Sequence, residues 1–130
     1  MSESCPFCNP SRSSILFENE YAYVKEDAYP VSKGHLLIIS KRHVKDWFSL
    51  TAAEQNAVNE LLCRAKRYLD ETYHPDGFNA GINCGTAAGQ TIFHVHMHLI
   101  PRYAGDAENP RGGVRGVISA KQDYCRKERE

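Results

Sequence analysis

Polar and apolar residues alternate strictly over residues 94–99, which read His-Val-His-Met-His-Leu, and Ile100 follows. A period of two is typical of a β-strand with one buried face, because successive side chains point to opposite sides. The three histidines would then stand in a row, with neighbours roughly 6.6 Å apart at a rise of about 3.3 Å per residue. One histidine in a strand most often has a structural role, but three in strict alternation favour a functional one.

Two chemistries use imidazoles placed in this way. Neighbouring imidazoles can share one Zn²⁺, since a Zn–N bond is only about 2.0–2.1 Å long. His94 and His98 would lie roughly 13 Å apart along the strand, so three collinear ligands on one ion would strain it. In nucleotidyl transfer, the central imidazole attacks phosphorus while its neighbours bind the phosphate oxygens. The spacing favours this second chemistry, with His96 as the attacking group.

Other patterns place the remaining elements of the chain. Thr51 and Glu54 form a capping box, and apolar residues at three- and four-residue spacing then predict one amphipathic helix over about 52–73. Short apolar runs predict a hairpin of two strands joined by Asn19-Glu20, and two further strands. These four strands are expected at residues 15–18, 21–25, 36–40 and 78–83. Val117-Ile118 is a candidate for one more short strand, followed by a charged tail over 121–130.

Length and charge narrow the function classes. A chain of 130 residues with 42% hydrophobic content fits one globular domain over residues 1–130. Basic and acidic residues number 16 each, so the net charge is zero, which argues against binding to long nucleic-acid polymers. The sequence shows no long apolar run of the kind that crosses a membrane, so we expect a cytoplasmic protein with a small-molecule substrate.

The motif at residues 94–100 matches the His-φ-His-φ-His-φ-φ motif (φ, apolar) of the histidine triad (HIT) superfamily at every position. Gly89-Gln90-Thr91 precedes it at the family's spacing. Residues 101–106 follow as in the fragile-histidine-triad branch and its bacterial relatives, and residues 30–39 resemble the family's Gly-His strand. The resemblance covers about residues 5–106 and leaves 107–130 as a tail. It implies the HIT fold, an α+β fold with an antiparallel sheet of about five strands, one long helix and one or more short helices.

The resemblance also implies a nucleotide hydrolase that works without a catalytic cofactor. His96 would attack the α-phosphate, and water would hydrolyse the nucleotidyl-histidine intermediate. His98 and His35 would hold the phosphate oxygens, while Gln90 and Thr91 would donate hydrogen bonds to the α-phosphate or the leaving oxygen. A backbone carbonyl can keep the proton on the second ring nitrogen of the nucleophile.

Two further polar residues occupy positions that the family uses for substrate. Asp27 lies where family members bind the ribose hydroxyls, which suit a carboxylate acceptor. Asn83 matches a family Asn or Gln near the phosphates. Phe7 and Ile15 are weaker candidates for the base pocket, because packing in the core explains them better.

Cys5-Pro6-Phe7-Cys8 is a close cysteine pair in a chain with five cysteines. A lone Cys-x-x-Cys is half of a zinc site, a redox dithiol or chance. HIT proteins with this pair resemble galactose-1-phosphate uridylyltransferases, whose remaining ligands correspond here to His43 and His94. The resemblance therefore implies a structural zinc held by Cys5, Cys8, His43 and His94, which leaves His96 and His98 for chemistry.

The sequence leaves the exact reaction open. Dinucleoside polyphosphates fit the branch best, with release of a nucleoside monophosphate, and nucleoside phosphoramidates are the alternative substrates. A nucleotidylyltransferase would use the same intermediate, and a zinc-bound nucleotide-sensing module with little turnover is a third reading. Arg111 and Arg115 are hypothesised to reach a polyphosphate or a second nucleoside. The resemblance also implies a homodimer formed through the long helix and a sheet edge.

Overall fold

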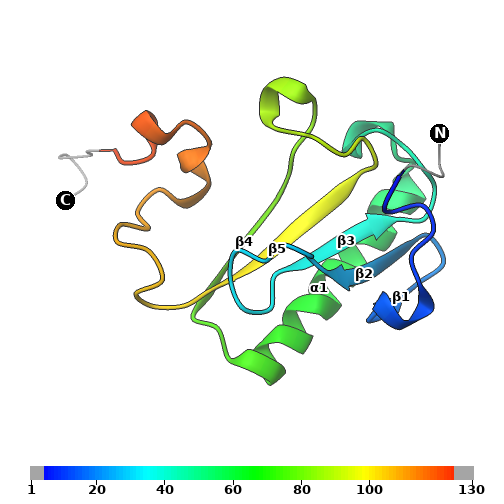
Figure 1. The fold of residues 1–130 in the computed structure, drawn as a ribbon, viewed down its shortest axis with the longest axis horizontal. Helices are drawn as coiled ribbons and strands as arrows, with labels where there is room; N and C mark the ends of the chain where they lie inside the picture. The colour runs from blue at the N-terminus through cyan, green and yellow to red at the C-terminus, as the bar shows by residue number, and fades with distance from the viewer. Residues whose placement is uncertain (1–4, 125–130) are drawn as a thin grey trace.

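The computed structural model describes residues 5–124, and their strands form one antiparallel sheet in the order β1-β2-β3-β5-β4 (Figure 1). One α-helix, α1 (Ala52–Tyr73), packs on this sheet, and short 3-10 helices lie in the loops. The five strands are β1 (Phe17–Glu18), β2 (Ala22–Glu26), β3 (Leu36–Ser40), β4 (Gly77–Ile82) and β5 (His96–Arg102). The predicted α+β fold is confirmed. No helix within residues 5–124 is long and apolar enough to cross a bilayer.

The helix α1 begins and ends where the sequence predicts. The Thr51 hydroxyl accepts a hydrogen bond from the Glu54 backbone N–H at 3.1 Å, and the Glu54 carboxylate accepts one from the Thr51 N–H at 2.8 Å. This capping box satisfies two backbone donors at the start of the helix. At the other end, His74 adopts the left-handed conformation with φ 54°, and its N–H donates to the Asp70 carbonyl.

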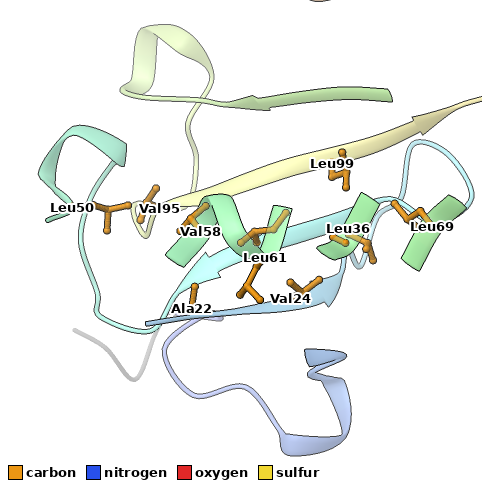
Figure 2. Packing of buried hydrophobic residues seen from close by; sticks show 11 residues of the cluster. Ala22, Val24, Leu36, Leu50, Val58, Leu61, Leu69, Val95 and Leu99 are labelled. Atoms are coloured by element: carbon orange, nitrogen blue, oxygen red, sulfur yellow. The ribbon is translucent and has the colours of Figure 1, made fainter. Parts of the chain in front are cut away.

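The two faces of the sheet have different partners. Side chains on one face pack against α1 and form the main core, as Figure 2 shows for Leu61 of the helix and Leu99 of β5. Residues of β3 alternate, so Leu37 and Ile39 lie on the opposite face with Phe7 and Tyr23. In β5, His98 pairs with Leu37 and His96 pairs with Ile39. Directly paired residues share a face, so these two histidines lie on the face away from the helix.

The strand with the triad starts later than the alternation suggests. β5 begins at His96, so His94 and Val95 lie outside it. The Val95 N–H donates to the Val44 carbonyl instead of joining the strand ladder, and the His94 ring lies against the end of β3. At its other end β5 continues through Pro101 to Arg102, which pairs with Gly77 of β4.

Residues 109–124 form a segment that we call the C-terminal arm, which lies beside β4 at the left of Figure 1. Val117 belongs to the 3-10 helix η5 (Gly113–Val117) and Ile118 precedes η6 (Ser119–Lys121), so the expected short strand at 117–118 is wrong. The tail expected at 121–130 is partly described, since residues 125–130 lie outside the described range.

Contacts within the C-terminal arm fold it on itself. The Gln122 amide donates to the Asn109 and Arg111 carbonyls, and the Arg115 guanidinium donates to the Gln122 and Lys121 carbonyls. The guanidinium groups of Arg111 and Arg115 also lie 5.1 and 5.0 Å from the ring centre of Tyr124. Both arginines thus contact other residues of the arm.

Candidate active site and metal site

Three histidine rings form the centre of the candidate active site. His96 and His98 come from β5, and His35 stands at the start of β3 with only 3% of its surface exposed. The ring centres of His96 and His98 lie 5.3 Å apart, and those of His35 and His98 lie 5.1 Å apart. The sheet therefore brings the histidine that precedes β3 to the third histidine of the triad.

The ring of His96 is held in one tautomer by the backbone. Its Nδ1 atom lies 2.8 Å from the carbonyl oxygen of His94, an acceptor that requires the proton on Nδ1. The lone pair of the neutral ring is then on Nε2, which is the form that attacks phosphorus. Phe7 contacts the ring at an edge-on angle of 61° and a centroid distance of 4.9 Å, which fixes its orientation. The expected backbone acceptor is thus confirmed.

One backbone hydrogen bond determines which ring nitrogen carries the proton in His35 and in His98. The Val31 N–H donates to Nδ1 of His35 at 3.1 Å, so the proton of His35 is on Nε2. This Nε2–H faces Nδ1 of His98 at 2.9 Å and donates to it. His98 therefore carries its own proton on Nε2.

This arrangement keeps the His35–His98 pair neutral. Both Nδ1 atoms accept hydrogen bonds and both Nε2 atoms carry protons, so a third proton would break one of the bonds. Burial lowers the pKa of His35, against the opposing effect of the Asp27 carboxylate. Burial also lowers the pKa of His98, and the neighbouring His96 and His35 rings act in the same direction. The Nε2–H of His98 is therefore available to donate a hydrogen bond near neutral pH.

The loop that carries the Val31 N–H is fixed at two positions just after Val31. Ser32 donates its hydroxyl hydrogen bond to the Pro101 carbonyl at 2.6 Å, which ties the loop to β5. Gly34 has φ 93°, and a Cβ there would lie 2.9 Å from the ring of Tyr73, so this position requires glycine. The two constraints hold Val31 against His35.

The carboxylate of Asp27 faces the two histidines. One oxygen accepts from the Tyr29 N–H at 2.8 Å, and the other lies 3.3 Å from Nε2 of His35 and 3.8 Å from Nδ1 of His98. These three ligand atoms are close enough to hold a metal ion. The Val31 N–H argues against a metal here, because it keeps a proton on the His35 nitrogen that would have to bind the ion.

The other residues expected to bind substrate, Gln90, Thr91 and Asn83, differ in their burial and in their contacts. Gln90 is buried, and its amide group donates to the Lys45 and Ile92 carbonyls and accepts from the Gly85 N–H, so it holds the loop before the triad. Thr91, the next residue, is exposed. Asn83 is half-buried and lies with His98 in the lining of one cleft.

That cleft has a volume of about 490 Å³ and opens beside His35 and His98. Its walls include Ile100 of β5 together with Val114 and Val117 of the C-terminal arm. Sequence reasoning did not assign these valines to the site, because the chain gives no local signal that the arm returns to β4. Gly81 of β4, which also lines the cleft, did carry a signal, since glycine within a strand is often found where a ligand approaches closely.

The four expected zinc ligands meet at one place. Ligand atoms of Cys5, Cys8, His43 and His94 all lie within 4.8 Å of one another. The Nδ1 atoms of His43 and His94 are 3.1 Å apart, Cys8 Sγ lies 3.1 and 3.5 Å from them, and Cys5 Sγ lies 3.3 Å from that of His94. Tetrahedral Zn²⁺ with ordinary bond lengths separates such atoms by roughly 3.3–3.6 Å. The four side chains thus fit this ion.

The neighbourhood of His94 also suits a metal ligand. Its Nε2 atom lies 2.7 Å from the Ser40 carbonyl oxygen, so Nε2 carries the proton and Nδ1 presents its lone pair to the cysteines. This contact explains why His94 leaves the strand register. The ring is fully buried, whereas His43 is exposed.

Comparison with known proteins agrees with this fold. The model of the HIT domain matches residues 9–105, and the chain therefore belongs to the HIT family. An uncharacterized HIT-like protein of Mycoplasma genitalium is 40% identical over 104 residues, covering 77% of this chain and 74% of that protein. A bis(5'-adenosyl)-triphosphatase of Dictyostelium discoideum is 36% identical, covering 75% and 66%. An AP-4-A phosphorylase of Mycobacterium tuberculosis is 31% identical, covering 78% and 53%.

Solved structures share the same fold. A HIT family protein from Bacillus anthracis superposes with a TM-score of 0.74 at 30% identity, covering 92% of this chain and 96% of that one. A zinc-bound histidine triad family protein from Mycobacterium smegmatis gives a TM-score of 0.72 at 31% identity, covering 92% and 94%.

Proposed function

We propose that this protein hydrolyses nucleotides at the α-phosphate through a nucleotidyl-His96 intermediate and releases a nucleoside monophosphate. The observation that carries the proposal is the hydrogen bond from Nδ1 of His96 to the His94 carbonyl, which leaves the Nε2 lone pair for attack. The names of the Dictyostelium and Mycobacterium tuberculosis relatives, both of which refer to adenosine nucleotides, support the same class of substrate.

The proposed reaction has two steps at phosphorus. Nε2 of His96 forms a bond to the α-phosphorus as the bond to the leaving oxygen breaks, and that oxygen keeps the electron pair. Water then attacks phosphorus, the N–P bond breaks with its electron pair returning to Nε2, and the proton of the water passes to solvent. The Nε2–H of His98 donates a hydrogen bond to the negative charge that develops in each step.

The state of His98 favours one kind of leaving group. A neutral imidazole stabilises charge by donating a hydrogen bond, but it is too weak an acid to protonate a departing amine. A phosphate oxygen of a dinucleoside polyphosphate leaves without a proton, whereas the amine of a phosphoramidate needs one. We therefore infer that dinucleoside polyphosphates are the better substrates of the two classes considered.

The remaining residues complete the proposed site. Asn83 and Thr91 bind phosphate oxygens, and Asp27 binds ribose hydroxyls with the lone pairs that Tyr29 leaves available. Gln90 acts by position, because its amide holds the loop that carries Thr91. His35 acts on the phosphate through His98, to which its Nε2–H donates.

A structural zinc is the second part of the proposal. Cys5, Cys8, His43 and His94 would hold it, and the zinc-bound neighbour from Mycobacterium smegmatis supports this assignment. Four protein ligands leave no open position for substrate, so the metal would tie the N-terminal segment to the strand ends beside the triad.

A phosphorylase is the second candidate, and the Mycobacterium tuberculosis relative is the observation that favours it. Inorganic phosphate would then take the place of water in the second step, and a nucleoside diphosphate would be released. The proposed intermediate is the same, so products of reactions with and without phosphate distinguish the two functions.

Rapid quenching under acid-free conditions tests the intermediate. Wild-type protein mixed with a dinucleoside polyphosphate labelled at the α-phosphate should carry acid-labile label, as expected for a P–N bond. His96→Ala should lose nearly all turnover but still bind nucleotide. Label on Cys84, or wild-type turnover by His96→Ala, would contradict the proposal.

A further inference from the structure

We propose that the cleft between β4 and the C-terminal arm binds the ring of the leaving group, and that it accepts an uncharged, ring-sized apolar moiety. This inference rests on the proposed function and names the class of group that leaves from the α-phosphate. The cleft is lined by His35 and by the His98 ring that would stabilise the departing charge, so it opens beside the reacting bond.

The floor of the cleft is open because of one glycine. Gly81 pairs directly with His98 across β4 and β5, so both residues lie on the face away from α1. A Cβ built on Gly81 would meet no atom within 4 Å. Packing therefore does not require glycine here, and its effect is to leave space beside His98.

The walls of the cleft are apolar and exposed. Val31 and Ile100 come from the body of the domain, and Val114 and Val117 come from the C-terminal arm. The three valines are 71%, 62% and 83% exposed. A ligand ring placed between them would remove this surface from water, which is favourable in proportion to the apolar area covered. A volume of about 490 Å³ lies within the range of small-molecule sites.

The charges around the cleft argue against a polyanion within it. None of its lining residues in the described chain is Lys, Arg, Asp or Glu. Arg111 binds Asp123 at 3.2 Å and Arg115 binds backbone carbonyls, and these contacts lie within the arm. Phosphate charges in the cleft would thus lack a lysine or arginine partner, whereas an uncharged ring needs none.

The outer wall lies beyond the part of the chain that the HIT domain model matches. The HIT domain model ends at residue 105, and the C-terminal arm that supplies Val114 and Val117 begins at 109. Gln122 braces the arm from within, where its amide bonds to carbonyls and its backbone oxygen would lie 2.0 Å from a Cβ at Gly112. The two valines take no part in that bracing, so their side chains can be exchanged without removing it.

Two leaving groups share this chemistry. One is the base of the second nucleoside in a dinucleoside polyphosphate, which reaches the cleft at the end of the phosphate chain. The other is an aryl group bonded to the leaving oxygen itself. Diadenosine triphosphate and the 4-nitrophenyl ester of adenosine monophosphate represent the two sources, and adenosine 5'-phosphorofluoridate serves as the reference because fluoride has no ring.

The test compares kcat/KM for these substrates in wild type, Gly81→Val and the pair Val114→Asp/Val117→Asp. Gly81→Val fills the floor at a strand position that suits valine, and the aspartates place charge on the outer wall. In both variants the ratio of kcat/KM for a ring-bearing substrate to that for the fluoridate should fall at least about tenfold, mainly through KM. Phe48→Asp, an exposed apolar residue of the 3-10 helix η3 (Trp47–Ser49) that does not line the cleft, should leave this ratio unchanged.

The outcomes separate the inference from the proposed function. If the kcat/KM ratio falls for diadenosine triphosphate alone, the cleft binds the second base. If it falls for the ester alone, the cleft binds a ring bonded directly to the leaving oxygen. Ratios that stay at the wild-type value in both variants would overturn the inference while fluoridate hydrolysis upholds the proposed function. Wild-type protein that cleaves none of the substrates would overturn both.

Discussion

Nε2 of His35 lies 2.9 Å from Nδ1 of His98, and the Val31 N–H on the other side of the His35 ring decides which of the two nitrogens carries the proton. A donor fixed by the backbone thus sets the tautomer of a side chain two hydrogen bonds away. The sequence suggested that His35 and His98 each hold a phosphate oxygen. Under the proposed function, His98 is instead the donor and His35 has a positioning role.

This relationship predicts different effects for the two histidines. His98→Ala removes the donor itself and should lower kcat by about 10²–10³, as for other single donors to developing charge. His35→Gln keeps an amide that can donate to Nδ1 of His98, so it should retain more activity than His35→Ala. Nitrogen NMR of His98 gives an independent measurement, since the proton should be on Nε2 in wild type and in His35→Gln. Equal activity of the two His35 variants, with an unchanged His98 spectrum, would contradict the assignment.

The proposed zinc predicts a loss of stability before a loss of chemistry. Cys5→Ser removes one of four ligands, and the melting temperature should fall by more than about 5 °C because metal binding is coupled to folding. Metal analysis of wild-type protein purified without chelator should give one zinc per chain. Cys63→Ser, at an exposed position on α1, is the matched control and should keep the zinc. Wild-type protein without zinc would contradict the assignment.

The homodimer stays a prediction, and the sheet order names its candidate edges. β1 and β4 are the outer strands of the sheet formed by the described residues, and β4 is the longer of the two. An outer strand presents unpaired backbone groups to a second copy. Light scattering at micromolar concentration should give twice the mass of the chain. A monomer at that concentration would contradict the prediction.

The sequence predicted those features that follow from local periodicity. The bounds of α1 follow from a capping box and a regular apolar spacing, and the face of His96 and His98 follows from a period of two. The alternation also extends over His94 and Val95, which lie outside the strand. Their departure depends on the Ser40 and Val44 carbonyls, residues far away in the chain whose position no local pattern encodes.

The outer wall of the cleft could not be predicted for a similar reason. The C-terminal arm is held by backbone carbonyls and by Gln122 rather than by a periodic apolar face. The sequence alone suggests that the arginines of the arm bind phosphate, because it reveals their charge. It does not reveal which groups in the folded chain they contact. The structure gives Arg115 two carbonyl partners within the arm, and Val114 and Val117 of η5 line the cleft.

The last prediction concerns Glu54, which links the start of α1 to the loop after β3. Its side chain is buried, and Arg42 donates two hydrogen bonds of 2.8 Å to its two oxygens. The Arg42 guanidinium lowers the pKa of Glu54 to about 2 from an ordinary value of 4.5. The folded state therefore favours the charged carboxylate, and the unfolded state binds a proton more readily. The Glu54 carboxylate therefore contributes its full share to the free energy of unfolding above about pH 4.5, and this contribution is lost as the pH falls towards 2.

Glu54→Gln should accordingly lower the free energy of unfolding by about 1.5–3 kcal/mol at pH 7, the usual value for hydrogen bonds to a charged group. The difference between wild type and variant should shrink as the pH falls from 4.5 towards 2, where wild-type Glu54 also becomes neutral. Urea unfolding at several pH values measures this, and zinc release at low pH affects both proteins alike. Asp70→Asn, which removes an exposed pair with Lys66, should cost less than about 0.5 kcal/mol throughout. A difference for Glu54→Gln that stays constant between pH 7 and pH 2.5 would show that the Arg42–Glu54 pair does not supply this stability.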